Sequence, residues 1–163
     1  MSFLKSIASL AMMAALSGCS IAPLGAERYS TAQLPLPTKE AVVLVVYRQT
    51  NPPLLRPLTV SINNNKGVLL SANSYFITKA NSGHVLVDVK YPKSSDDIHI
   101  DKMYEGGTIH YLEIAGDVEL KGFMNPYIEH WDAVIERPSE SAAISLSECC
   151  RRINTTDTES ANK

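Results

Sequence analysis

The chain has 163 residues, of which 45% are hydrophobic and 20% are charged, and its formal net charge at pH 7 is −2. This length suits one domain, and the near-neutral balance argues against nucleic acid as a partner, because binding phosphates takes a concentrated basic surface. Beyond the N-terminal region no stretch reaches about 18 apolar residues, so the sequence predicts no later membrane-spanning helix.

Residues 1–18 have the pattern of a secretory signal peptide. Lys5 is the only charged residue before Glu27, and it precedes a run of apolar and small residues, Ile7–Leu16. That run is too short to cross a hydrocarbon core, which takes about 20 residues. A basic start, a short apolar run and small residues before a cleavage point are typical of signal peptides. The alternative is a buried N-terminal helix, but the run has no polar face.

The motif Leu16-Ser17-Gly18-Cys19 follows this run and resembles the lipobox of bacterial lipoproteins. The resemblance implies that the Cys19 thiol is alkylated with diacylglycerol, that the chain is cleaved before Cys19, and that the new amino group is acylated. Two or more acyl chains hold a protein stably on a membrane. Ser20, in place of an aspartate, implies export to the outer membrane. The expected membrane contact is therefore a lipid anchor, with the domain facing the periplasm.

Residues 19–40 are interpreted as the lipidated cysteine and a flexible linker. Pro23, Pro35 and Pro37 favour extended polyproline geometry, which rises about 3.1 Å per residue. Such a linker would hold the domain some tens of Å from the membrane. An arm partly docked on the domain is the alternative.

Short strand patterns separated by turn residues fill the next hundred residues. Ala41–Arg48 is rich in β-branched residues without alternation, which predicts a strand buried on both faces. Leu58–Ile62 alternates cleanly, with one apolar face. The later candidate strands are Val68–Leu70, Ser74–Thr78, His84–Tyr91, Asp97–Asp101 and Thr108–Ala115, then a last hairpin of Val118–Phe123 and Tyr127–Glu136 joined through the turn Met124–Pro126.

Turn signals every eight to twelve residues indicate a mainly β fold over residues 41–153, an antiparallel β-sandwich (immunoglobulin/transthyretin-like) with one short C-terminal helix. The helix is expected after Pro138, with Ser139 as its N-cap, running through Arg151 and Arg152. Residues 154–163 are polar, which predicts a disordered tail.

Two cysteines besides Cys19, Cys149 and Cys150, are adjacent in the chain. The favoured interpretation is a pair of small apolar residues on the helix face. One alternative is a vicinal disulfide, which would distort the helix, since neighbouring cysteines fit the usual bridge geometry poorly. The other alternative is a bond to another protein.

Four stretches carry a resemblance to a known family: Val45–Arg48, Pro57–Leu70, Asn73–His84 and Glu105–Ile114. They resemble the domain of unknown function 2846 family of bacterial lipoproteins, and the similar region runs roughly from residue 41 to 135. The family usually has proline where this chain has Ser82. The resemblance implies a compact β-sandwich on a lipid anchor, and it implies no catalytic residue.

Asp97, His99 and Asp101 would share one face of a strand, which makes them weak candidates for a metal site. Their side chains would stand about 7 Å apart, which is wide for ligands of one ion. A solvent-facing row on an edge strand explains the same pattern. His84 and His110 could meet across strands, although nothing in the sequence shows it. No G-x-S-x-G motif occurs.

Five aromatic residues could line a binding cleft or fill the core: Tyr91, Tyr104, Tyr111, Tyr127 and Trp131. For Trp131 the core is favoured, because it shares a strand face with two apolar residues. No cofactor is indicated. The sequence therefore predicts a non-enzymatic, lipid-anchored envelope lipoprotein that binds or scaffolds a protein or glycan partner at the outer membrane. The alternative is a metal- or serine-dependent periplasmic hydrolase.

Overall fold

The structure is a computed structural model, and it describes residues 25–49, 57–90, 97–121 and 127–153. Within these ranges the side chains of residues 117–121 and 127–132 are not described. The predicted signal peptide, the lipidation site Cys19 and the predicted disordered tail 154–163 lie outside the described residues, so they remain predictions.

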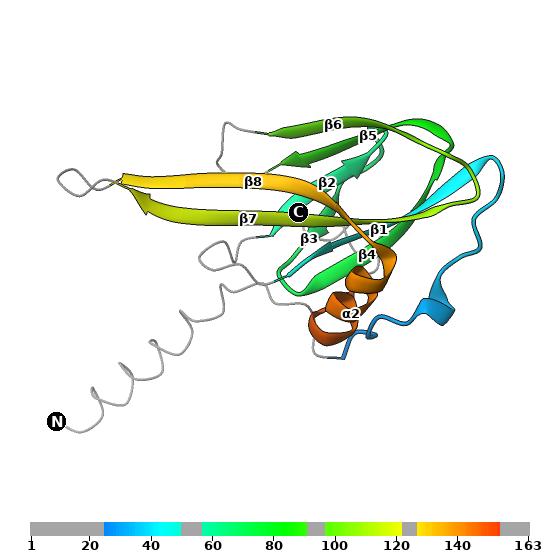
Figure 1. Cartoon of the computed structure of the whole chain (residues 1–163), viewed down its shortest axis with the longest axis horizontal. Coiled ribbons are helices and arrows are strands. Elements are labelled where there is room, and N and C mark those ends of the chain that lie inside the picture. The colour runs from blue at the N-terminus through cyan, green and yellow to red at the C-terminus, as the bar shows by residue number, and fades with distance from the viewer. Residues whose placement is uncertain (1–24, 50–56, 91–96, 122–126, 154–163) are drawn as a thin grey trace, which may run out of the picture.

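The described strands form two sheets that pack face to face (Figure 1). The predicted mainly β sandwich with one short helix is therefore confirmed. The five-stranded sheet has the order β8-β7-β1-β4-β9, from Tyr127–Arg137, Ile109–Lys121, Ala41–Arg48, Ser74–Asn81 and Arg151–Arg152. The four-stranded sheet has the order β3-β2-β5-β6, from Val68–Leu70, Leu58–Ile62, Gly83–Lys90 and Ile98–Tyr104.

The two sheets differ in strand direction. All pairs in the four-stranded sheet are antiparallel, as predicted. In the five-stranded sheet β1 runs antiparallel to β4 but parallel to β7, and β9 runs parallel to β4. The larger sheet is therefore mixed, a difference from the expected antiparallel sandwich.

β1 is the central strand of the five-stranded sheet and is buried on both faces, which confirms the expectation from its sequence. Leu44 and Val46 belong to the inner core between the two sheets. Val45 and Tyr47 point the other way, into an outer core. Each of these four side chains has no exposed surface. The molecule therefore has a third layer on the outside of the larger sheet.

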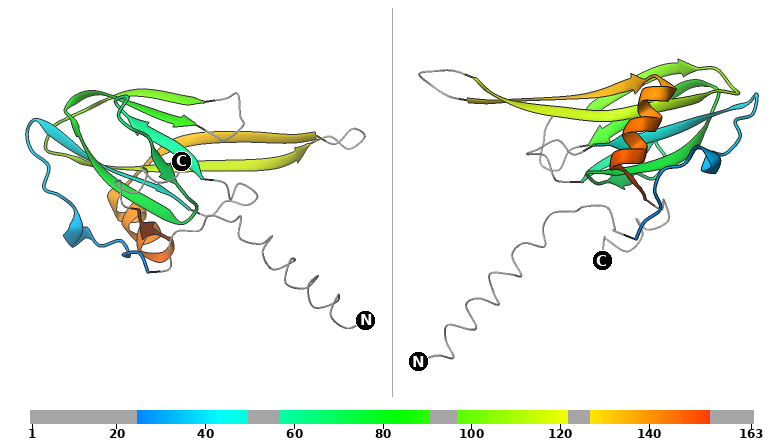
Figure 2. Two further views of the ribbon diagram at one scale, coloured as in Figure 1. Left: turned by 180° about the vertical axis from the view of Figure 1, so that it is seen from behind. Right: turned by 60° about the horizontal axis from the view of Figure 1, so that its bottom comes forward.

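That third layer consists of the helix α2 (Ser139–Cys149) and the N-terminal arm, residues 25–40 (Figure 2). Helical spacing brings Ala142 and Leu146 of α2 onto the sheet, and Cys150 joins them just after the helix ends. The outer core consists of Tyr29, Val45, Tyr47, Tyr75, Tyr111, Ala142, Leu146 and Cys150.

The expected flexible linker is wrong for the described part of residues 19–40, where the docked arm is found instead. Tyr29 is buried, and its hydroxyl lies 3.0 Å from that of Tyr111. The backbone N–H of Arg152 donates to the carbonyl of Glu27 at 2.8 Å. A short 3-10 helix, η1 (Thr31–Gln33), follows. Burying the Tyr29 ring favours the docked arm over an arm that is free in solvent.

The C-terminal helix differs from the prediction at both ends. Its N-cap residue is Pro138, which makes no side-chain cap, and Ser139 is already helical. The helix ends at Cys149, because Cys150 is extended and the next two residues pair with β4 as β9. Cys149 and Cys150 form a disulfide. The favoured interpretation of two unbonded cysteines is thus wrong, and the bond avoids distorting the helix because Cys150 has left it.

The predicted break between Thr108–Ala115 and Val118–Phe123 is also wrong. β7 continues through Gly116 as one strand and pairs antiparallel with β8 from Tyr111–Arg137 to Lys121–Tyr127. The predicted last hairpin is confirmed, but it is longer than expected. Within β7 only Ile109–Glu113 pairs with β1, so the far part of this hairpin projects beyond the body of the sandwich (Figure 1).

Candidate functional site

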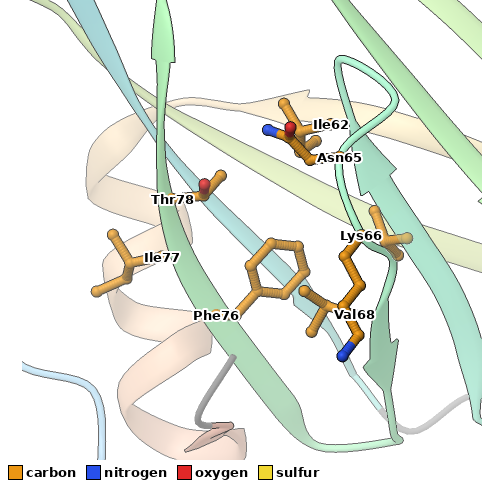
Figure 3. A pocket seen from close by; sticks show the side chains of 8 residues that line it. Ile62, Asn65, Lys66, Val68, Phe76, Ile77 and Thr78 are labelled. Atoms are coloured by element: carbon orange, nitrogen blue, oxygen red, sulfur yellow. The ribbon is translucent and has the colours of Figure 1, made fainter. Parts of the chain in front are cut away.

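A pocket of about 150 Å³ opens at the edge of the sandwich, between β4 of one sheet and the β2–β3 turn of the other. Phe76 projects from β4 toward Val68, while Ile77 points to the opposite side of the strand (Figure 3). The Lys66 side chain runs beside Val68 at the rim. The lining consists of Val60, Ile62, Asn65, Lys66, Val68, Phe76, Ile77 and Thr78.

The β2–β3 turn that forms one wall is fixed by its asparagines. Asn63 and Asn64 have φ values of 51° and 58°, a left-handed conformation that asparagine tolerates better than most residues. The side chain of Asn63 also accepts a hydrogen bond from the backbone N–H of Leu86 at 2.8 Å. The sequence prediction of a turn here is confirmed, and the turn is held against the neighbouring strand β5.

The pocket combines an apolar floor with a polar rim. Phe76 is 1% exposed and belongs to the inner core, whereas Lys66 is exposed. Lys66 has no ion pair with any described residue. Pockets that bind whole small molecules are usually about 300–1,000 Å³, so this one suits a single apolar side chain or a group of similar size. A negative charge beside that group would meet Lys66.

The weak metal candidates do not converge. His99 forms a hydrogen bond through its Nδ1 with the carboxylate of Asp88, which lies directly opposite it in the β5–β6 pair. Asp101 Oδ1 lies 3.0 Å from His84 Nδ1, within hydrogen-bond distance. Each histidine therefore has its own carboxylate partner on the neighbouring strand, and Asp97 is exposed immediately before β6. No group of three or more metal-binding side chains is found among the described residues.

His110 does not meet His84 but lies in a separate cluster that joins β6, β7 and β8. Its Nδ1 bonds Glu136, which also accepts a hydrogen bond from Lys102. Burial alone would raise the pKa of Glu136, but these two hydrogen bonds outweigh it and lower the pKa below the ordinary value. Tyr104 packs against the imidazole, with ring centroids 4.5 Å apart. The cluster ties the edge of one sheet to the edge of the other.

This cluster also contains the arrangement nearest to a hydrolytic triad. The Thr108 hydroxyl lies 2.8 Å from His110 Nε2, and Glu136 bonds the other ring nitrogen. However, the hydroxyl donates its proton to the carbonyl of Glu105 at 2.6 Å, so His110 does not take that proton. The geometry fits a structural role, in which the Thr108 hydroxyl stabilises the turn after β6 by its hydrogen bonds to Glu105 and His110.

A second charged group lies on the outer side of the larger sheet. Glu113 is 8% exposed, and its carboxylate accepts hydrogen bonds from Arg137 at 2.6 Å and from Gln49 at 3.3 Å. Burial, and then the charge of Glu113, raises the pKa of Tyr47 to about 12. Buried carboxylates need such partners, so this cluster is explained by stability alone.

The aromatic residues divide between core and undescribed positions. Tyr104 and Tyr111 are buried, which supports the core interpretation for these two. Tyr91 lies outside the described residues, as do the side chains of Tyr127 and Trp131. Tyr29 was missed, because it stands alone in a segment that the sequence presents as a linker.

The pocket was not predicted from the sequence. Its two walls come from β4 and from a turn of the other sheet, and no local pattern shows which turn faces which strand. Only the glycine-and-asparagine turn signal at residues 63–67 could have pointed to this wall.

Searches of this chain against family models, curated proteins and solved structures return no match. The resemblance to the lipoprotein family therefore remains a prediction. Among the described residues, no helix is long and apolar enough to cross a membrane.

Proposed function

We propose that this protein is a lipid-anchored envelope lipoprotein that binds a protein partner at the outer membrane without catalysing a reaction. The observation that carries the binding role is the pocket between β4 and the β2–β3 turn. Its floor is apolar, and its rim carries Lys66, which forms no ion pair with a described residue. The lipobox-like motif supports the anchor, and the domain of unknown function 2846 resemblance agrees with it.

The chemistry of the pocket favours a protein over a glycan. A sugar presents hydroxyl groups on all sides; Asn65, Lys66 and Thr78 at the rim could hydrogen-bond some of them, but those buried against Val60, Val68 and Phe76 would be left without partners. An aliphatic or aromatic side chain fits the same floor, because an apolar cavity of roughly 150 Å³ accepts a group the size of a benzene ring. A neighbouring acidic residue of the partner would pair with Lys66.

The anchor is tested by replacing its attachment point. Cys19→Ala removes the thiol that would be alkylated, so we expect radiolabelled palmitate to be absent from the variant and its precursor to stay uncleaved. The measurement is metabolic labelling followed by immunoprecipitation, with Cys149→Ala as a matched variant that keeps the label. Labelling of Cys19→Ala at the level of the unaltered chain would refute the anchor.

The pocket is tested by filling it. Thr78→Phe places a ring in the pocket, and we expect it to weaken partner binding at least tenfold, as blocking a central apolar pocket commonly does. The measurement is photo-crosslinking in intact cells from a reactive residue at the exposed position 65, which leaves Lys66 in place, comparing the partner adduct with and without Thr78→Phe.

The matched control for this experiment is Lys79→Gln on the same strand. Lys79 is exposed but does not line the pocket, so its variant should keep the adduct. An adduct that persists unchanged in Thr78→Phe would show that the pocket is not the binding site.

A further inference from the structure

The docked arm determines where the chain leaves the folded domain toward its N-terminus. Glu27 pairs with Arg152 at 3.5 Å through its side chain, and its carbonyl accepts the Arg152 N–H at 2.8 Å. The Arg151 guanidinium donates to the carbonyl of Ala26 at 3.1 Å. The arm, β9 and the end of α2 therefore meet at one end of the outer layer (Figure 2). We call this end the anchor pole: Glu27, Arg28, Glu148, Arg151 and Arg152.

The length of chain between Cys19 and this pole is short. The eight residue steps from Cys19 to Glu27 span at most about 29 Å when fully extended. A free linker up to Glu40 would have reached roughly 65 Å in polyproline geometry. Docking of the arm thus removes more than half of the tether's reach and makes the anchor pole the part of the domain that the tether holds nearest to the attachment point.

The charges at this pole suit an anionic surface. It carries three arginines and two glutamates, and one glutamate, Glu27, is paired with Arg152. Arg28 is exposed, and its described contact is a backbone bridge to Arg151. A guanidinium binds a phosphate through two parallel hydrogen bonds. Basic residues held near an anionic bilayer are attracted to it over about a Debye length.

We propose that the anchor pole lies against the membrane in the tethered protein, where Arg28, Arg151 and Arg152 contact the phosphates of lipid headgroups. This inference rests on the lipid anchor of the proposed function. The outer face of the four-stranded sheet belongs to the opposite layer, so it points away from the bilayer. The domain is then held in one orientation on the membrane.

The test uses the full chain, lipidated in cells and reconstituted into vesicles of phosphatidylethanolamine and phosphatidylglycerol. A benzophenone-bearing residue replaces Ser147 near the pole or Met103 on β6, and neither adds a thiol beside the disulfide. Both positions are exposed. We expect lipid crosslinks at position 147 to exceed those at position 103 several-fold. Equal yields at the two positions would overturn the inference.

A matched pair of charge variants tests the role of the arginines. Arg28→Gln should lower the lipid crosslinks at position 147 by about fivefold, while Lys90→Gln, which removes the same charge from the exposed outer face of the four-stranded sheet, should leave them unchanged. Equal effects of the two variants would overturn the headgroup contact. If the full chain made in cells carries no lipid on Cys19, the anchor itself is refuted, and this inference with it. Equal crosslinks at the two positions from a chain that is lipidated and bound to the vesicles refute the orientation alone.

Discussion

Truncating either face of β1 is expected to destabilise the protein strongly. Leu44→Ala should lower the free energy of unfolding by about 2–5 kcal/mol, because the side chain is fully buried in the inner core and leaves a cavity. Val45→Ala should lower it by about 1.5–3 kcal/mol, because Val45 is equally buried against the outer core. Urea denaturation of the purified chain measures both values, with an unchanged slope showing that the denatured state is unaffected.

Leu36 provides the matched control for these truncations. It is 84% exposed in the N-terminal arm, so Leu36→Ala should change the free energy of unfolding by less than about 0.5 kcal/mol. The Val45 result discriminates better between a two-layer and a three-layer structure, since a two-layer sandwich would leave the Val45 face of the sheet in water. A Val45→Ala variant as stable as Leu36→Ala would contradict the third layer.

The features that the sequence predicted correctly depend on local patterns. Ala41–Arg48 and Leu58–Ile62 have the predicted bounds, because β-branched runs and strict alternation each leave one low-energy way to bury the apolar residues. The turn at residues 63–67 follows from the backbone preferences of asparagine and glycine. None of these signals needs information about distant parts of the chain.

The errors arose where distant contacts decide the structure. The predicted strands ended at Ala115 and resumed at Val118, but pairing with β8 carries β7 through Gly116 as one strand. Arg151 and Arg152 continue a helical pattern in the sequence, yet they form a short strand because they pair with Ser74 and Tyr75 at the edge of β4. Tyr29 is buried only because α2 and β4 leave room for its ring. In each case tertiary pairing overrides local preference.

The candidate site was harder to predict than the fold, for a related reason. Phe76 and Val68 each read as ordinary core residues, and nothing in the sequence marks the gap left between them. Such a gap depends on the spacing of two sheet edges, which is set by the packing of all the strands. The same holds for the anchor pole, where Glu27 and Arg152 meet across more than a hundred residues.

Gly106→Ala is the second substitution with a large expected effect. The turn after β6 lies where the N-terminal arm meets β1, and the Gly107 N–H donates to the carbonyl of Ala41, the first residue of β1, at 3.0 Å. A Cβ on Gly106 would overlap the backbone carbonyl of Lys39 and come within 3.2 Å of the Ser82 side chain. A backbone carbonyl cannot rotate away as a flexible side chain would, so the arm and the turn must separate.

We expect this separation to cost about 1–3 kcal/mol of unfolding free energy, the usual range for overpacking. Differential scanning calorimetry would record it as a lower melting temperature. Gly25→Ala is the matched control, because its new Cβ meets nothing within 4 Å and its φ is not positive. That variant should be neutral or slightly stabilising, since alanine narrows the unfolded ensemble. Equal melting temperatures for the two variants would show that the arm does not pack against the turn.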